Sequence, residues 1–256
     1  MYMKNYLLPL VVVAALMACA DTYTESYSIQ GSSSVSLLDG SKLYLKAMSE
    51  GNMKNIDSCE VVHGGFGFTG RYDSTHMALL AAQEGGMPIV IEKGDIRVTI
   101  DKMANRVSGS PLNELLYGFL DKHIQLANQI GELGHKQAQM ILDGIDEVTI
   151  GKTLSAENER LLAQTDSLET RFVLDNLDNV LGPYVFQMLT ATYPYPVLTP
   201  QIEEIMVKAT DKFKNDPYVS EYYKAAKDLL ARMRGEVTEQ QSDALPTDTA
   251  VERAIP

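Results

Sequence analysis

The spacing of apolar residues changes near residue 110, and this change constrains the fold more than any other feature of the chain. Before it, apolar and polar residues alternate in short segments, as at Ile96, Val98 and Ile100 of DIRVTID. Such alternation is typical of strands with one buried and one solvent-facing side. Beyond it, apolar residues recur at steps of three and four, which is the spacing of one helix face. The sequence therefore predicts an α+β protein, with an antiparallel β-sandwich or barrel over residues 27–109 and an α-helical bundle over residues 110–234.

Turn signals divide the first region into short strands. Asp39-Gly40 lies between two apolar segments, and Asp-Gly is a strong signal for a β-hairpin. Further glycine-containing turns follow at intervals of roughly 8 to 12 residues, which favours several short antiparallel strands.

The helical region opens with a start signal. Ser110 is a suitable N-cap, Pro111 suits the first helical position, and Glu114 adds negative charge near the positive end of the helix dipole. Gly131 and Gly134 weaken the middle of this segment, so we expect a bend or a break there.

The remainder of the chain is predicted to be helical almost to its end. Proline-containing segments separate further expected helices over residues 155–181, 183–193, 199–214 and 217–234. Asp143, Asp146 and Glu147 stand beside apolar positions, and a solvated helix face explains them better than a calcium loop. Residues 235–256 lack periodicity and are expected to form a disordered tail.

Residues 1–18 have the parts of an export signal, with a positive charge at Lys4, an apolar run and small residues before Cys19. The run of about ten apolar residues is too short to cross a bilayer, which takes roughly 20. LMAC, residues 16–19, resembles the bacterial lipoprotein box, which implies cleavage before Cys19 and its modification with acyl chains such as palmitate. Residues 19–26 are then a lipidated tether, and we expect the protein in the cell envelope, on the outer membrane facing the periplasm. A signal peptide that happens to contain a cysteine is the alternative.

Cys19 and Cys59 are the only cysteines of the chain. If Cys19 is acylated, Cys59 is a free thiol without a disulfide partner in the same chain. In IDSCEVV, Cys59 shares a strand face with Val61, so we expect a small, buried and inert side chain. A reactive thiol is the alternative.

Charge and motif content exclude several classes of protein. The chain has 34 acidic and 22 basic residues and a formal net charge of -12, which argues against binding to the nucleic-acid backbone. His123 and His135 lie on a predicted helix about 120° apart around its axis, so we expect no metal site and no cofactor. No glycine-rich phosphate loop or nucleophile elbow is present, and no catalytic residue is assigned.

Tyrosines gather in the later helices and in the loop YPYPVLTP. Tyr193 and Tyr195 of this loop are the candidate binding residues, because tyrosine combines a flat apolar ring with a hydroxyl group. Packing between helices is the other common use of such residues.

Four segments in order, LLDGSKLYL, IDSCEVVHGGFGFTG, MPIVIEKGDIRVTID and VSGSPLNELL, resemble a known family. It is the small β domain of unknown function that precedes the thioredoxin-like domain in Bacteroides-type lipoproteins. The matching positions are Asp57, Ser58, Gly65, Phe66, Phe68, Gly70, Gly109 and Ser110. The segment FVLDNLDNVLGPYVFQML is similar to the family's helical connector.

The same resemblance limits the expected chemistry. In relatives the connector leads into a thioredoxin domain with a Cys-x-x-Cys pair, and this sequence contains no such pair. Disulfide exchange needs an attacking thiolate and a resolving thiol. The resemblance therefore implies the scaffold and the envelope location without the redox activity, and we expect the protein not to be an enzyme.

Two hypotheses for function follow from the sequence. The first is a non-catalytic, membrane-anchored envelope lipoprotein that acts as a binding or interaction module for an envelope protein or a glycan. The second is an accessory component of an envelope thiol-disulfide system, in which Cys59 or its surroundings engage a separate thioredoxin-like partner. The reactivity of Cys59 in the native protein separates the two hypotheses.

Overall fold

The computed structural model describes residues 25–49, 51–82 and 85–235. These residues form two compact units, and the boundary between the units falls between Gly118 and Phe119, inside helix α1 (Pro111–Gly131). The expected signal peptide, the lipidation site Cys19 and the expected tail beyond Gly235 lie outside the described residues.

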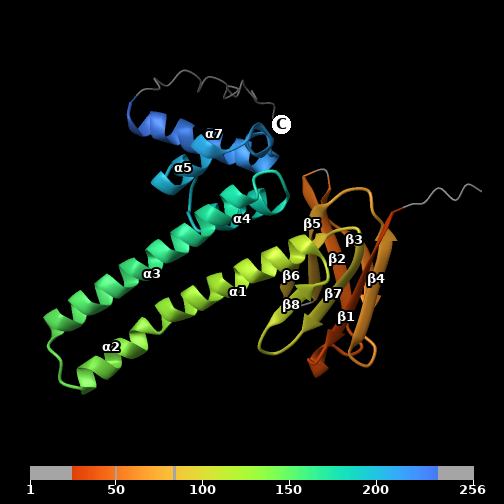
Figure 1. Ribbon diagram of the computed structural model, residues 1–256, viewed down its shortest axis with the longest axis horizontal. Coiled ribbons are helices and arrows are strands. Elements are labelled where there is room, and N and C mark those ends of the chain that lie inside the picture. Colours follow the sequence, from red (N-terminus) through yellow and green to blue (C-terminus); the bar gives the residue numbers. More distant parts are fainter. Residues whose placement is uncertain (1–24, 50, 83–84, 236–256) are drawn as a thin grey trace, which may run out of the picture. The chain divides into compact units, whose positions relative to one another are not determined.

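The first unit consists of two four-stranded sheets, drawn in red to yellow in Figure 1. One sheet has the spatial order β4 (Gly65–Arg71), β1 (Ser26–Ser33), β7 (Gly94–Ile100) and β8 (Asn105–Ser108). The other has the order β3 (Asn52–Glu60), β2 (Lys42–Ser49), β5 (His76–Ala82) and β6 (Gly85–Ile91). The predicted α+β class, with a β region of two sheets followed by helices, is confirmed.

One strand pair departs from the expected antiparallel arrangement. β1 pairs with β7 in parallel, with Ile29 opposite Ile96, whereas the other paired strands run antiparallel. Parallel neighbours need a long crossover connection, and here the chain builds the whole second sheet and β4 between β1 and β7.

The predicted hairpin at Asp39-Gly40 is wrong, because β1 and β2 belong to different sheets. Ser36–Leu38 instead form a short 3-10 helix (η1), and Gly40 follows with φ +76°, a left-handed conformation that glycine adopts without strain. The Asp-Gly pair does make a turn, but the turn carries the chain from one sheet to the other.

The alternation of the sequence produces the core of the first unit. Leu43 and Leu45 of KLYLK are buried, and so are Ile96 and Val98 of DIRVTID. Phe66 and Phe68 lie on the same strand face with ring centroids 6.5 Å apart in an edge-to-face arrangement, a favourable geometry for aromatic pairs. They belong to the Gly-x-Phe-x-Phe-x-Gly run of β4.

The first turns of α1 cover the free edge of β6. Asn113 is fully buried; its Oδ1 accepts a hydrogen bond from the Val90 N–H (2.9 Å) and its Nδ2 donates to the Val90 carbonyl (2.7 Å). The Tyr117 hydroxyl donates to the Pro88 carbonyl (2.9 Å). Two side chains of one helix thus satisfy backbone groups that an open sheet edge would leave unpaired.

The start of α1 is stabilised by a residue that the sequence did not indicate. Glu92 Oε2 accepts hydrogen bonds from the N–H groups of Leu112 (3.0 Å) and Asn113 (3.3 Å). The hydroxyl of Ser110, the predicted N-cap, instead accepts from Asn113 Nδ2 (2.8 Å). A carboxylate at this end also interacts favourably with the helix dipole.

The second unit is helical. After α1 the chain forms α2 (Leu133–Leu142), α3 (Glu147–Asp175), α4 (Leu181–Thr190), α5 (Pro200–Lys208), α6 (Asp211–Lys214) and α7 (Pro217–Met233). The predicted break is confirmed, since α1 ends at Gly131 and α2 begins two residues later. No helix within the described ranges combines the length and the apolar content needed to span a bilayer.

Two helix boundaries differ from the prediction because of caps. α3 begins at Glu147 instead of residue 155, because Asp146 accepts hydrogen bonds from the backbone N–H and the hydroxyl of Thr149. The helix predicted over residues 199–214 is divided, because Ala209 has an extended backbone and the Thr210 side chain caps α6.

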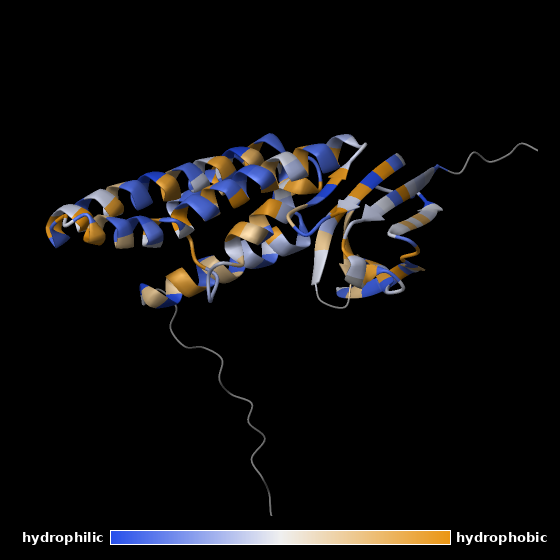
Figure 2. Ribbon diagram, turned by 90° about the horizontal axis from the view of Figure 1, so that it is seen from below, coloured by the Kyte–Doolittle hydropathy of each residue, from blue (hydrophilic) through white to orange (hydrophobic). Residues whose placement is uncertain are grey.

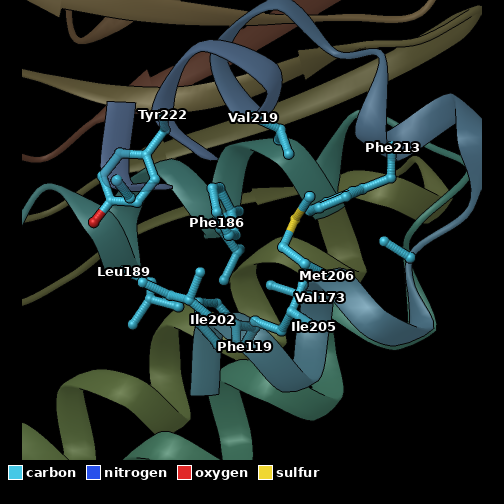
Figure 3. Close-up of a cluster of buried hydrophobic side chains, with 13 residues drawn as sticks. Phe119, Val173, Phe186, Leu189, Ile202, Ile205, Met206, Phe213, Val219 and Tyr222 are labelled. Atoms are coloured by element: carbon cyan, nitrogen blue, oxygen red, sulfur yellow. The ribbon is translucent and has the colours of Figure 1, made fainter. Parts of the chain in front are cut away.

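Helices α3 to α7, together with Phe119 of α1, enclose the core of the second unit (Figure 3). Phe186 lies at its centre, with its ring 5.6 Å from that of Phe213 and 5.7 Å from that of Tyr222, both edge-to-face. The whole cluster comprises Phe119, Val173, Val185, Phe186, Leu189, Ile202, Ile205, Met206, Ala209, Phe213, Val219, Tyr222 and Ala226.

Candidate interaction surface

A pair of antiparallel helices projects from the core of the second unit, and we call it the arm. It consists of residues 119–168: the second part of α1, α2 and the first part of α3 (Figure 1). Lys136 of α2 and Glu157 of α3 form an ion pair across the two helices. Few side chains of the arm are buried, and α2 has none.

The base of the arm is joined to the rest of the second unit by a histidine and a glutamate. His123 Nε2 lies 2.9 Å from Oε1 of the buried Glu169, and Gln201 Nε2 donates to Glu169 Oε2 (3.3 Å). The three side chains come from α1, α3 and α5. His123 therefore connects helices, which the sequence did not indicate because its partner is 46 residues away.

The other end of the arm carries exposed apolar side chains. Ile141, Leu142, Ile145 and Val148 lie at the turn between α2 and α3, and we call these four residues the arm tip. Leu142 is 81% exposed and Val148 is 66% exposed. Figure 2 shows apolar segments, in orange, beside polar segments at this end of the helix pair. Exposed apolar residues that adjoin one another are typical of interaction sites.

Three carboxylates stand between the apolar residues of the tip in the sequence. Asp143 and Glu147 are exposed, and Asp146 is the N-cap of α3. Hydrogen bonds from the Thr149 side chain and backbone lower the pKa of Asp146, so its carboxylate stays ionised at mildly acidic pH. The tip therefore presents apolar side chains within a negatively charged rim.

The surface of α5 to α7 has the opposite charge in one groove. We call it the lysine groove; it measures about 470 Å³ and is lined by Met206, Lys214, Ser220, Tyr223, Lys224, Lys227 and Asp228. Lys227 Nζ lies 5.3 Å from the centre of the Tyr223 ring, within range of a cation–π interaction. The half-buried Tyr223 gives the groove an apolar part, whereas Met206 belongs to the buried core, and three lysines against one aspartate make the charge of the groove positive.

The candidate binding residues Tyr193 and Tyr195 share a loop but differ in surroundings. Tyr195 is 57% exposed, whereas Tyr193 is half-buried against the core of the second unit. The Tyr222 hydroxyl accepts from the Val197 N–H (3.1 Å) and donates to the Val197 carbonyl (3.3 Å), which fixes the end of this loop to α7. Of the two tyrosines, Tyr195 has the larger surface available for contact.

Cys59 lies on β3 and is half-buried, in place of the fully buried position that the sequence predicted. Its partial burial raises the pKa of the thiol; the backbone N–H of Gly67 lowers it, and the charge of Asp57 raises it again. A raised pKa disfavours the thiolate, which is the nucleophilic form of cysteine. The described residues give Cys59 no disulfide partner.

Comparison with known proteins identifies the first part of the chain. Residues 27–116 match the family model described as "Domain of unknown function (DUF4369)". Searches of curated proteins and of solved structures gave no match. The matched residues comprise the two sheets and the first turns of α1, which include Asn113 at the edge of β6. Residues 27–116 of this chain are therefore similar to the DUF4369 domain, a domain of unknown function.

Proposed function

We propose that the protein is a non-catalytic, lipid-anchored interaction module of the bacterial cell envelope. The arm tip is the observation that carries the interaction part of this proposal. Four large apolar side chains are exposed at the turn between α2 and α3, although the hydrophobic effect favours burial of such side chains within a folded unit.

The arm is suited to hold its tip at a distance from the core of the second unit. α3 has 29 residues, which corresponds to about 44 Å at 1.5 Å per residue. The Lys136–Glu157 pair joins α2 to this helix near the tip, and the His123–Glu169 contact joins α1 to it at the base. The α1–α2 side of the arm is thus joined to α3 at two places.

The anchor part of the proposal rests on the LMAC sequence, residues 16–19. Attachment through acyl chains on Cys19 would concentrate the module at a membrane surface, where a modest affinity for a membrane-bound partner is sufficient. Thiol-disulfide chemistry receives no support from Cys59, because its surroundings raise the thiol pKa.

The proposal is tested by photo-crosslinking in intact cells. A benzoylphenylalanine at position 142 of the full-length, lipidated protein is expected to give a discrete crosslinked adduct. The same group at position 159, an exposed site on α3 away from the tip, serves as the matched control. Equal adducts at the two positions, or none at position 142, would contradict an interaction through the tip.

A second comparison tests whether the adduct depends on the apolar residues of the tip or on exposed apolar residues of the arm in general. Ile145→Ser combined with Val148→Ser is expected to reduce the adduct at position 142 several-fold, because a contact stabilised by apolar burial loses two of its side chains. Leu162→Ser alters an exposed apolar residue of the same arm outside the tip and should leave the adduct unchanged.

A further inference from the structure

The arm tip and the lysine groove are complementary in charge and share an apolar character. The tip combines four apolar side chains with the carboxylates of Asp143, Asp146 and Glu147. The groove combines the half-buried ring of Tyr223 with Lys214, Lys224 and Lys227. Each surface therefore offers an apolar contact that is bordered by charge opposite in sign to that of the other surface.

The charges on both surfaces are available for an external partner. Within the described ranges, Lys214, Lys224 and Lys227 have no carboxylate as an ion-pair partner. At the tip, Asp143 accepts a hydrogen bond from Gln139 and Asp146 accepts from Thr149, and neither pairs with a cation of the part of the chain that the structure describes. Among residues 119–235, the two sets of charges thus form no ion pairs.

The tip and the groove of one chain cannot meet. α3, which is 29 residues long, begins at the tip and ends at the core that α4 to α7 form (Figure 1). A continuous helix of this length keeps its ends about 44 Å apart. A contact between these surfaces therefore requires two copies of the chain.

We infer that the arm tip of one copy docks into the lysine groove of a second copy. This inference rests on the proposed function and names the partner of the tip. The apolar side chains of the tip would contact the Tyr223 ring and the methylene stems of the lysines, while Asp143 and Glu147 would lie near the lysine ammonium groups. Each copy has one tip and one groove, so two copies that exchange tips form a closed dimer, and a one-way contact propagates into a chain.

A lipid surface is a poorer occupant for the tip. Anionic headgroups attract clusters of Lys and Arg, whereas the apolar residues here are bordered by three carboxylates. Asp228 at the groove is the one carboxylate among its lining residues, and the three lysines outnumber it.

The test measures crosslinking between two differently tagged full-length copies expressed in the same cells. Charges are reversed first on one surface and then on both, and the second reversal is expected to restore the crosslink. The first copy carries benzoylphenylalanine at position 142 and the substitutions in the tip. The second copy lacks the crosslinker and carries the substitutions in the lysine groove. With natural sequences, we expect an adduct between the two tags whose crosslinked peptide maps to α5–α7. Asp143→Lys with Glu147→Lys in the first copy spares the Asp146 cap and should reduce that adduct about tenfold, because repulsion replaces attraction.

The reciprocal change distinguishes docking from misfolding. Lys224→Glu with Lys227→Glu in the second copy should reduce the adduct to a similar extent, and combining it with the reversed tip in the first copy should restore it. Glu159→Lys on the arm and Lys122→Glu in α1 are matched reversals outside the two surfaces, and the adduct should persist with both.

Three outcomes would overturn the inference: failure of the combined reversals to restore the adduct, a crosslink to another part of the second copy, or an adduct with a different molecule only. In the last case the proposed function still stands, since the tip binds a partner. Absence of any adduct at position 142 would contradict both.

Discussion

At the scale of single residues, Gly31 and Phe66 depend on each other. Phe66 lies against the backbone of Gly31 on the neighbouring strand, and a Cβ built on Gly31 would lie 2.0 Å from Phe66 Cζ. Gly31→Ala is therefore expected to lower the free energy of unfolding by about 1 to 3 kcal/mol, as overpacking does in cores. Urea denaturation measures this loss.

Gly118→Ala is the matched control for Gly31. Gly118 lies inside α1, and a Cβ built there meets nothing within 4 Å. Alanine stabilises a helix by up to about 1 kcal/mol relative to glycine, so this variant should be as stable as the natural protein or more so. Similar losses in both variants would show that crowding against Phe66 is not the cause.

Single residues also show where prediction from sequence stops. The alternation in KLYLK and DIRVTID correctly placed Leu43 and Ile96 inside, because one strand period decides which face is buried. Cys59 was placed too deep, since β3 is an edge strand with a register shift opposite Leu45 and Lys46, and its exposure depends on neighbours that the local pattern does not contain.

At the scale of elements, the contact between α1 and β6 depends on Asn113. Asn113→Ala would leave the Val90 N–H and C=O, both buried, without their partner. Because an unsatisfied buried polar group costs about 1 to 3 kcal/mol, we expect the free energy of unfolding to fall by about 3 kcal/mol. Chemical denaturation of the variant gives the value.

Gln125→Ala is the appropriate comparison for Asn113→Ala. Gln125 is an exposed amide of the same helix, and its loss should change the stability by no more than about 0.5 kcal/mol. If Asn113→Ala proved as mild as Gln125→Ala, water would have replaced the side chain at Val90, and the edge of β6 would not depend on α1.

The elements of the candidate site were only partly predictable. The break after Gly131 followed from glycine in a helix, but the turn that forms the arm tip did not, because α3 was expected to begin at residue 155. Asp146 and Thr149 were the available signal, an N-cap acid three residues before a threonine. The sequence correctly indicated that the acidic residues of the tip are solvated. Their position beside exposed apolar residues follows from the turn between α2 and α3, which the sequence did not predict.

At the scale of the whole molecule, the proposed lipid anchor on Cys19 would separate this protein from a freely diffusing one. Cells fed an alkyne analogue of palmitate are expected to label the natural protein and to leave Cys19→Ser unlabelled, because acylation requires the thiol and the free amino group of that residue. In-gel fluorescence of the immunoprecipitated protein measures the label.

Cys59→Ser controls for labelling at the second cysteine. It removes the other thiol of the chain and should retain the full label. Loss of the label in Cys59→Ser with retention in Cys19→Ser would reverse the assignment and would support the alternative of a signal peptide with an incidental cysteine.

Helix α1 belongs to both units, and this affects any attempt to join the β domain to a different helical region. The family match ends at residue 116 and the first unit ends at Gly118, yet the helix continues to Gly131 without a linker. Each inserted residue turns all that follows by 100° about the helix axis. When a different helical partner is grafted onto this β domain, the number of residues at the junction therefore decides which face of the continued helix is turned toward the core of the new partner.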